Sequence, residues 1–170
     1  MSNYKIIFSN PIHYKNINNL TTNNGIYYIF RMKYSKDFQV YYVPLYIGKV
    51  CREDKKSKGI QERIKEHFSV NNDKIKDYVN DLLYYPKDNQ GIITPEGTQD
   101  NVGSSPAVYI ASCELDKSDD IENIEAALIY DNRDKLILNE KSKESYNKGN
   151  ITIDIEGNTY GLKSHTSLEN

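Results

Sequence analysis

The chain has 170 residues, of which 38% are hydrophobic and 27% are charged, and its formal net charge at pH 7 is -2. This size and composition are typical of a single globular domain, so we expect residues 1–170 to form one domain. The acidic balance argues against a protein covered in positive charge, and a surface that binds nucleic acid must therefore be a local one.

The sequence gives no sign of a membrane or an oxidising compartment. No stretch approaches the roughly 20 apolar residues that cross a bilayer, and residues 1–10 are too polar for a signal peptide. Cys51 and Cys113 have neither a CxxC partner nor a nearby His cluster, which predicts reduced thiols rather than a zinc site. We therefore expect a cytoplasmic protein with no membrane partner.

The first part of the chain alternates between β-rich runs and polar segments. Aromatic and β-branched residues predict strands at residues 4–8, 25–31 and 39–50, while turn signals predict irregular segments at 10–24 and 32–38. The second and third strands are separated by a modest loop, so we expect them to form an antiparallel hairpin. Pro44 predicts that the last strand lies at an edge or contains a bulge.

Two helices are predicted after a charged loop at residues 52–58. The first covers residues 59–68, where Ile60, Ile64 and Phe68 form an apolar stripe. The second runs from Asp73 to Tyr85 and is ended by Pro86. Its inward side chains are expected to be Ile75, Tyr78, Val79, Leu82 and Leu83.

The remaining elements complete an α+β domain. Glycine and proline residues predict a long loop at 87–106, and a strand follows at 107–115. A helix is expected from about Asp119 to Asn132, followed by a short extended piece at 136–139 and a β-hairpin around Gly157 and Asn158. The helix should bury Ile121, Ile124, Ala127, Leu128 and Ile129. Helices then flank a small sheet.

Short motifs occur in a particular order along the chain. They read GIYYI at residues 25–29, LYIGK at 45–49, RIKEHF at 63–68, IEAALIY at 124–130 and LILN at 136–139. Each motif alone is common in unrelated proteins. Together and in this order they resemble the GIY-YIG nuclease family, and the resemblance spans roughly residues 25–139.

The resemblance implies a fold and a site. The fold is a small antiparallel or mixed three-stranded sheet flanked by helices, with residues 25–139 as its core, loop insertions, and residues 140–170 as a C-terminal extension with a β-hairpin. The site residues carried over by position are Tyr27, Tyr46, Arg63, His67, Glu125 and Asn139, supported by Gly25, Gly48 and Lys49.

The spacing departs from that of the compact family members. The intervals from Tyr27 to Tyr46 and from Tyr46 to Arg63 are expanded, as is the segment at 69–106. Such insertions resemble the restriction-enzyme branch of the family more than the repair-enzyme branch. They also leave Arg52 as a competitor for the position of Arg63.

The residue types suit phosphodiester hydrolysis. Glu125 is expected to hold a divalent ion, Mg²⁺ or Mn²⁺, and Mg²⁺ suits a site with few protein ligands. Glu122 and Glu114 are the alternatives for this carboxylate. Arg63 is expected to pair with the scissile phosphate through its guanidinium fork, and Asn139 to fix the site by hydrogen bonds.

A tyrosine is expected to be the general base that takes a proton from water. Tyr27 is favoured, although Tyr46 could exchange roles with it. The pKa of a free tyrosine is about 10, so nearby cations must lower it for work at neutral pH. The candidates are Lys49, Arg63, His67 and the metal ion. His67 lies four residues after Arg63, on the same helix face.

The expected function is a metal-dependent DNA endonuclease of a restriction system or a mobile element. The alternative is a catalytically inactive module of the same fold that binds DNA or protein. Loop residues would recognise the DNA bases, and the candidates are Asn89, Gln90, Gln99 and Asn101. One active site cuts one strand, so a double-strand cut would suggest a homodimer, and a nicking or structure-specific monomer is the alternative.

Overall fold

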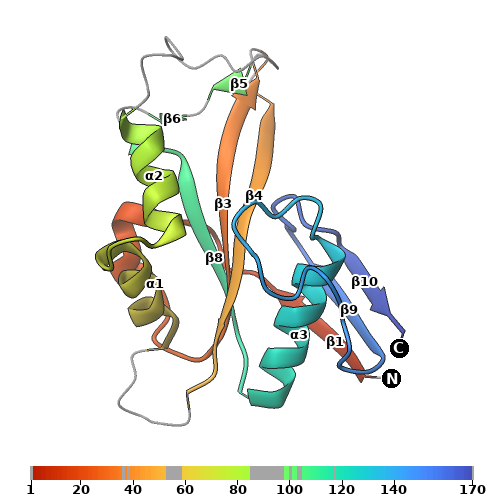
Figure 1. Cartoon of the computed structure of the whole chain (residues 1–170). Helices are drawn as coiled ribbons and strands as arrows, with labels where there is room; N and C mark the ends of the chain where they lie inside the picture. Colours follow the sequence, from red (N-terminus) through yellow and green to blue (C-terminus); the bar gives the residue numbers. More distant parts are fainter. Residues whose placement is uncertain are drawn as a thin grey trace.

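Four strands side by side form the centre of the molecule. The computed structural model describes residues 2–35, 37, 39–52, 59–84, 98–99, 101–102, 105–116 and 118–169. Within these residues the central sheet has the order β2 (Ile12–His13), β8 (Val108–Glu114), β3 (Gly25–Ser35) and β4 (Val40–Val50), and β5 (Thr98–Gln99) pairs with the end of β3. Every pairing in this sheet is antiparallel (Figure 1).

The α+β class and the β3–β4 hairpin are confirmed, while the size of the sheet is corrected. A three-stranded sheet was expected, whereas among the described residues the central sheet has five strands and a second sheet has three. The added strands β2 and β5 are two residues long, too short to produce an alternating pattern. β3 also continues to Ser35, so that four of the seven residues of the loop expected at 32–38 are strand.

Strand β4 is an edge strand with a bulge, as Pro44 predicted. The register shifts because Tyr46 pairs with Ile29 while Pro44 pairs with Phe30, leaving Leu45 as the extra residue. A segment that is not a strand forms hydrogen bonds with the free edge of β4. The amide nitrogens of Ile137 and Leu138 donate to the carbonyls of Pro44 and Leu45 at 3.3 and 2.8 Å. Residues 136–139, expected to be extended, therefore run beside β4.

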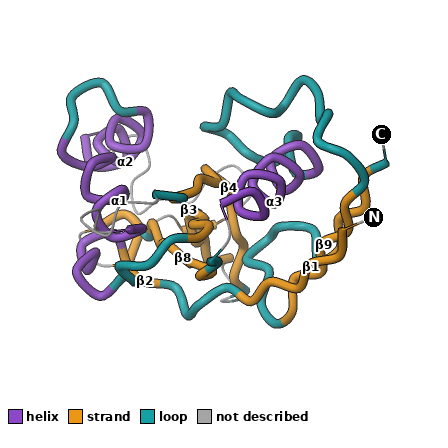
Figure 2. Tube along the Cα trace, turned by 90° about the horizontal axis from the view of Figure 1, so that it is seen from below, coloured by secondary structure: helices purple, strands orange, loops and turns teal. Residues whose placement is uncertain are grey.

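Alternation along β3 divides the interior into two cores. Ile26, Tyr28 and Phe30 face one side, and Tyr27 and Ile29 face the other. Helices α1 (Gly59–Ser69) and α2 (Lys74–Tyr84) cover the side of Tyr27, while α3 (Ser118–Asp131) covers the opposite side (Figure 2). The predicted helices are thus confirmed, and the side chains expected to face inward on α3 are buried.

The small sheet joins the two ends of the chain. β1 (Ser2–Ile7) runs parallel to β9 (Ile151–Glu156), and β10 (His165–Leu168) pairs antiparallel with β9, which places the termini close together in Figure 1. The C-terminal hairpin exists, but its second strand begins after the residues expected. The reason is Tyr160, whose ring stacks on Phe30 at a centroid distance of 4.9 Å and so holds its segment as a loop over the core.

Three further segments differ from the sequence expectations or lie beyond the description. The polar segment at 10–24 contains β2 and a 3₁₀ helix, η1 (Tyr14–Asn19). Most of the loop expected at 87–106 lies outside the described residues, although β6 (Asn101–Val102) pairs with β7 (Ser105–Pro106). In the described part of the chain, no helix combines the length and apolarity needed to span a bilayer.

Candidate active site

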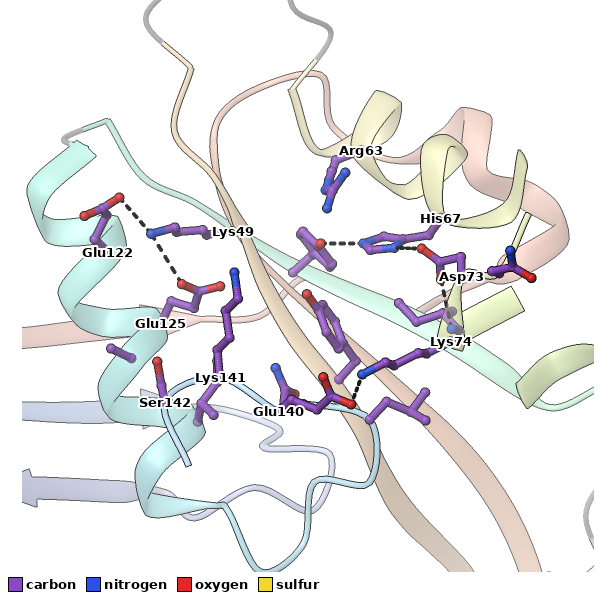
Figure 3. A pocket seen from close by; sticks show the side chains of 18 of the residues that line it. Lys49, Arg63, His67, Asp73, Lys74, Glu122, Glu125, Glu140, Lys141 and Ser142 are labelled. Atoms are coloured by element: carbon purple, nitrogen blue, oxygen red, sulfur yellow. Dashed lines mark hydrogen bonds and ion pairs between the residues drawn. The ribbon is translucent and has the colours of Figure 1, made fainter. Parts of the chain in front are cut away.

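A cavity of about 630 Å³ opens over the outer edge of β4. Its walls come from β3, β4, α1, the start of α2, α3 and the segment at 138–148, so that it lies between the two groups of helices (Figure 3). The six site residues expected from the motifs all line it: Tyr27, Tyr46, Arg63, His67, Glu125 and Asn139.

Two tyrosine rings form the base of the cavity. Tyr27 and Tyr46 come from neighbouring strands and stack at a centroid distance of 6.1 Å. Gly48 lies opposite Tyr27 in the sheet, and a Cβ atom at Gly48 would lie 2.4 Å from the Tyr27 hydroxyl and 2.7 Å from the Tyr46 ring. A side chain at position 48 would therefore displace both rings.

Gly25 sets the start of the strand that carries Tyr27. Its φ of +149° is a conformation that residues with a side chain rarely adopt. A Cβ atom there would also lie 2.0 Å from the carbonyl oxygen of Cys113 on β8. Gly25 thus allows the close approach of β3 to β8 that precedes Tyr27.

A chain of hydrogen bonds leads from Tyr27 to the start of α2. The hydroxyl oxygen of Tyr27 lies 2.7 Å from Nε2 of His67, and Nδ1 of His67 lies 2.7 Å from Oδ2 of Asp73. An ionised carboxylate can only accept, so the proton of neutral His67 is on Nδ1. Nε2 then accepts the hydrogen bond from the Tyr27 hydroxyl.

Burial has the largest effect on the pKa values of Tyr27, Tyr46 and His67, contrary to the expectation from the sequence. Desolvation and the neighbouring Tyr46 raise the pKa of Tyr27 well above its usual value, although Arg63 opposes this. Desolvation also raises the pKa of Tyr46. Desolvation lowers the pKa of His67 despite the nearby Asp73. Both tyrosines and His67 are therefore neutral at neutral pH. Arg63 lowers the pKa of each tyrosine, as expected of a nearby cation, but desolvation outweighs it.

On the other side of the cavity, α3 presents two carboxylates to one lysine. Nζ of Lys49 lies 2.8 Å from Oε1 of Glu122 and 3.5 Å from Oε2 of Glu125. The Glu125 side chain is 18% exposed and that of Glu122 is 46% exposed. Desolvation raises the pKa of Glu125. Glu114, the other alternative, lies elsewhere and accepts from Asn23 at 2.8 Å.

The carboxylates offer a sparse set of metal ligands. Among the residues that the structure describes, no group of three or more His, Cys, Asp or Glu side chains could enclose an ion. The half-buried Glu125 carboxylate is the group whose desolvation a cation would relieve most.

The structure distinguishes the two candidate arginines. Both contact the same carboxylate, since Arg63 and Arg52 lie 2.8 and 3.3 Å from Glu66. Arg63 lines the cavity beside Tyr27, whereas Arg52 is not among the lining residues. Arg63 is therefore the guanidinium available to a ligand in the cavity.

Asn139 holds the edge of β4 by a two-point contact. Its Oδ1 accepts from the amide of Ile47, and its Nδ2 donates to the carbonyl of Ile47, both at 2.8 Å. Because Ile47 lies between Tyr46 and Gly48, this contact fixes the strand at the base of the cavity. The hydrogen-bonding role expected of Asn139 agrees with this geometry.

Several lining residues were not expected from the sequence. Asp73 and Lys74 come from the start of α2, where the only signal was that Asp73 suits a helix cap. Lys141 and Lys148 come from the irregular segment after Asn139, and Lys141 extends into the cavity (Figure 3). An ion pair between Lys74 and Glu140 joins the two walls.

The residues suggested for base reading cannot be placed against this cavity. Asn89 and Gln90 lie outside the described residues, as do the side chains of Gln99 and Asn101, whose backbones belong to β5 and β6. Comparisons with protein-family models, curated proteins and solved structures found no match.

Proposed function

We propose that this protein is a metal-dependent endonuclease that hydrolyses phosphodiester bonds in DNA, with a site of the GIY-YIG type. One observation carries the proposal. Residues from β3, β4, α1, α3 and the segment beside β4, chosen from sequence motifs alone, line a single cavity. They supply a guanidinium, a half-buried carboxylate and a hydrogen-bonded Tyr–His pair, which together meet the needs of phosphodiester hydrolysis.

The cations of the cavity bind the phosphate. Arg63 lies beside Tyr27 on one wall, and its planar fork suits two phosphate oxygens. Lys141 and Lys148 line the cavity from the 138–148 segment, and Lys148 lies 3.6 Å from Glu122. These side chains offer positive charge to the phosphates on either side, next to the carboxylates that line the same cavity.

Glu125 is the residue that would hold the divalent ion. The bound ion would supply positive charge to the phosphate and to the leaving oxygen in the transition state. Glu122 keeps Lys49 at 2.8 Å, so that Lys49 retains a carboxylate partner when Glu125 engages a cation. Lys49 thereby positions the carboxylates of α3 at the mouth of the cavity.

The Tyr27–His67 pair removes the proton from water. Tyr27 accepts the proton of the attacking water on its hydroxyl oxygen while its own proton moves to Nε2 of His67, 2.7 Å away. The water becomes the nucleophilic hydroxide, Tyr27 ends neutral, and His67 becomes the imidazolium. This transfer needs no resting phenolate, which agrees with the raised pKa of Tyr27.

The proposal is tested by incubating supercoiled plasmid with the protein and Mg²⁺ or Mn²⁺. We expect nicked or linear DNA from the wild type and from Glu144→Ala, a control at an exposed carboxylate outside the cavity. Glu125→Ala should leave the plasmid intact. Absence of cleavage with every divalent ion, or cleavage that survives Glu125→Ala, overturns the proposal.

One contact favours an alternative, a binding module of the same fold without catalysis. The ammonium group of Lys49 lies 3.5 Å from Glu125 and already offsets its charge, which would make a cation unnecessary. This alternative expects DNA or protein to bind in the presence of chelator and to remain intact when Mg²⁺ is added. Electrophoretic mobility shifts with intact, recoverable DNA would favour it over the nuclease.

A further inference from the structure

We propose that Asp73 is a positioning residue that fixes the tautomer and orientation of His67, so that Nε2 is free to accept the proton of Tyr27. The consequence for cleavage rests on the proposed nuclease function, whereas the tautomer itself does not. Asp73 carries no part of the motif set, and its role is read from geometry alone.

Three contacts hold Asp73, and two of them are to its carboxylate. Its Oδ1 accepts from the amide of Ile75 at 2.9 Å, which caps the first turn of α2, and its backbone carbonyl accepts from the amide of Asp77 at 2.9 Å. The other carboxylate oxygen, Oδ2, lies 2.7 Å from Nδ1 of His67. The helix cap thus aims a second, separate oxygen at the imidazole.

His67 has little freedom apart from this contact. It is 5% exposed, and the rings of Tyr27 and Tyr46 meet it edge-on at centroid distances of 5.8 and 5.5 Å. These rings confine the imidazole plane but do not choose which nitrogen carries the proton. That choice falls to the groups at its two nitrogens, the Tyr27 hydroxyl and the Asp73 carboxylate.

The other charged groups around His67 do not replace Asp73. Arg63 and Glu66 on the same helix act on it only through space and oppose one another, and they form an ion pair at 2.8 Å. Lys74 is paired with Glu140, and Glu125 acts on the tyrosines from across the cavity. The carboxylate hydrogen-bonded to the imidazole is that of Asp73.

One substitution, Asp73→Asn, should keep the helix cap while changing the tautomer of His67. Asn caps a helix about as well as Asp, so Asp73→Asn keeps the hydrogen bond that the amide of Ile75 donates to Oδ1. Its side-chain NH₂ then faces Nδ1 of His67 and can only donate. His67 must accept at Nδ1 and carry its proton on Nε2, which leaves the Tyr27 hydroxyl without an acceptor on the imidazole.

The test reads the ring nitrogens of His67 by ¹⁵N NMR in the full-length protein, with His67→Gln to assign the signals. We expect a proton on Nδ1 in the wild type and in Asp77→Asn, an exposed control on the same helix turn, and a proton on Nε2 in Asp73→Asn. If Asp73→Asn unfolds, Asp73→Ser keeps a capping oxygen and serves in its place. A wild-type proton on Nε2, or a tautomer that does not change in the variant, overturns the proposal.

The kinetic arm uses the same variants on plasmid DNA. Loss of a correctly oriented base should lower kcat by about 100-fold or more, with KM for DNA changed by less than about threefold because no phosphate contact is lost. A kcat that stays at the wild-type value after the tautomer has changed overturns the positioning role. If the wild type cuts nothing, the nuclease proposal fails while the NMR result still decides the tautomer.

Discussion

The hydroxyl of Tyr27 and Nε2 of His67 lie 2.7 Å apart at the base of the cavity, joining a strand of the central sheet to a helix packed on it. Since desolvation raises the pKa of Tyr27 and lowers that of His67, the pair rests as a neutral phenol and a neutral imidazole. In the proposed mechanism the proton moves from Tyr27 to His67 as water supplies a replacement.

Stability should fall in mildly acidic solution because of His67. Its pKa is lowered in the folded state, so below about pH 6.5, the usual histidine pKa, the unfolded chain binds a proton that the folded chain does not. The free energy of unfolding therefore decreases as pH falls from about 6.5 through the folded-state pKa. Urea unfolding at several pH values should show a steeper decrease for the wild type than for His67→Gln. Equal slopes would contradict a neutral buried His67.

Gly48→Ala should damage the base of the cavity. The added Cβ would lie 2.4 Å from the Tyr27 hydroxyl, and overpacking of this kind costs about 1–3 kcal/mol. Urea unfolding measures the loss. In a Tyr27→Ala background the same substitution should cost less, because the nearer of the two rings that it meets is gone while Tyr46 remains. A cost that is equal in both backgrounds would contradict the close contact.

Asn139→Ala should loosen the edge of β4. It removes two 2.8 Å hydrogen bonds to the backbone of Ile47, and each bond lost from a buried group costs about 1–3 kcal/mol. The free energy of unfolding should fall, and the Ile47 amide should exchange its hydrogen faster. Asn139→Asp keeps the acceptor and should protect that amide partly. Unchanged exchange at Ile47 in Asn139→Ala would exclude this role.

Arg63 and Arg52 should differ sharply in their effect on cleavage, although both contact Glu66. Arg63→Ala should lower kcat by about 100-fold or more, the usual effect of losing a donor to the transition-state charge. Arg52→Ala should change it by only a few-fold, since Arg52 is not among the cavity residues. The reverse order would show that Arg52 is the phosphate ligand.

Much of the central fold could be predicted because its patterns are local. Ile60 and Ile64 repeat at the helical period and are buried, while Tyr27 and Tyr28 alternate between the two faces of β3. The pairing of β1 with β9 could not be predicted, because it joins residues from opposite ends of the chain. Tyr160 was read as part of a strand for a similar reason, since its stacking partner Phe30 is distant in sequence.

The candidate site, like the fold, could be predicted from the sequence only in part. Motif order sufficed to select Tyr27, Arg63, Glu125 and other residues that line the cavity. It could not give their protonation, because desolvation depends on packing that no motif records. Asp73 was missed since its partner His67 belongs to another element. Lys141 was missed because the segment that carries it has no periodic pattern, and only the edge of β4 brings that segment to the cavity.

The central claim is that this cavity hydrolyses DNA, and sequencing the DNA ends left after incubation with Mg²⁺ tests it most directly. We predict new ends that appear with the wild type, disappear with chelator and are absent with Glu125→Ala; ends on both strands would indicate a homodimer, and ends on one strand a nicking monomer. No new ends with any divalent ion, or the same ends from Glu125→Ala, would contradict the claim.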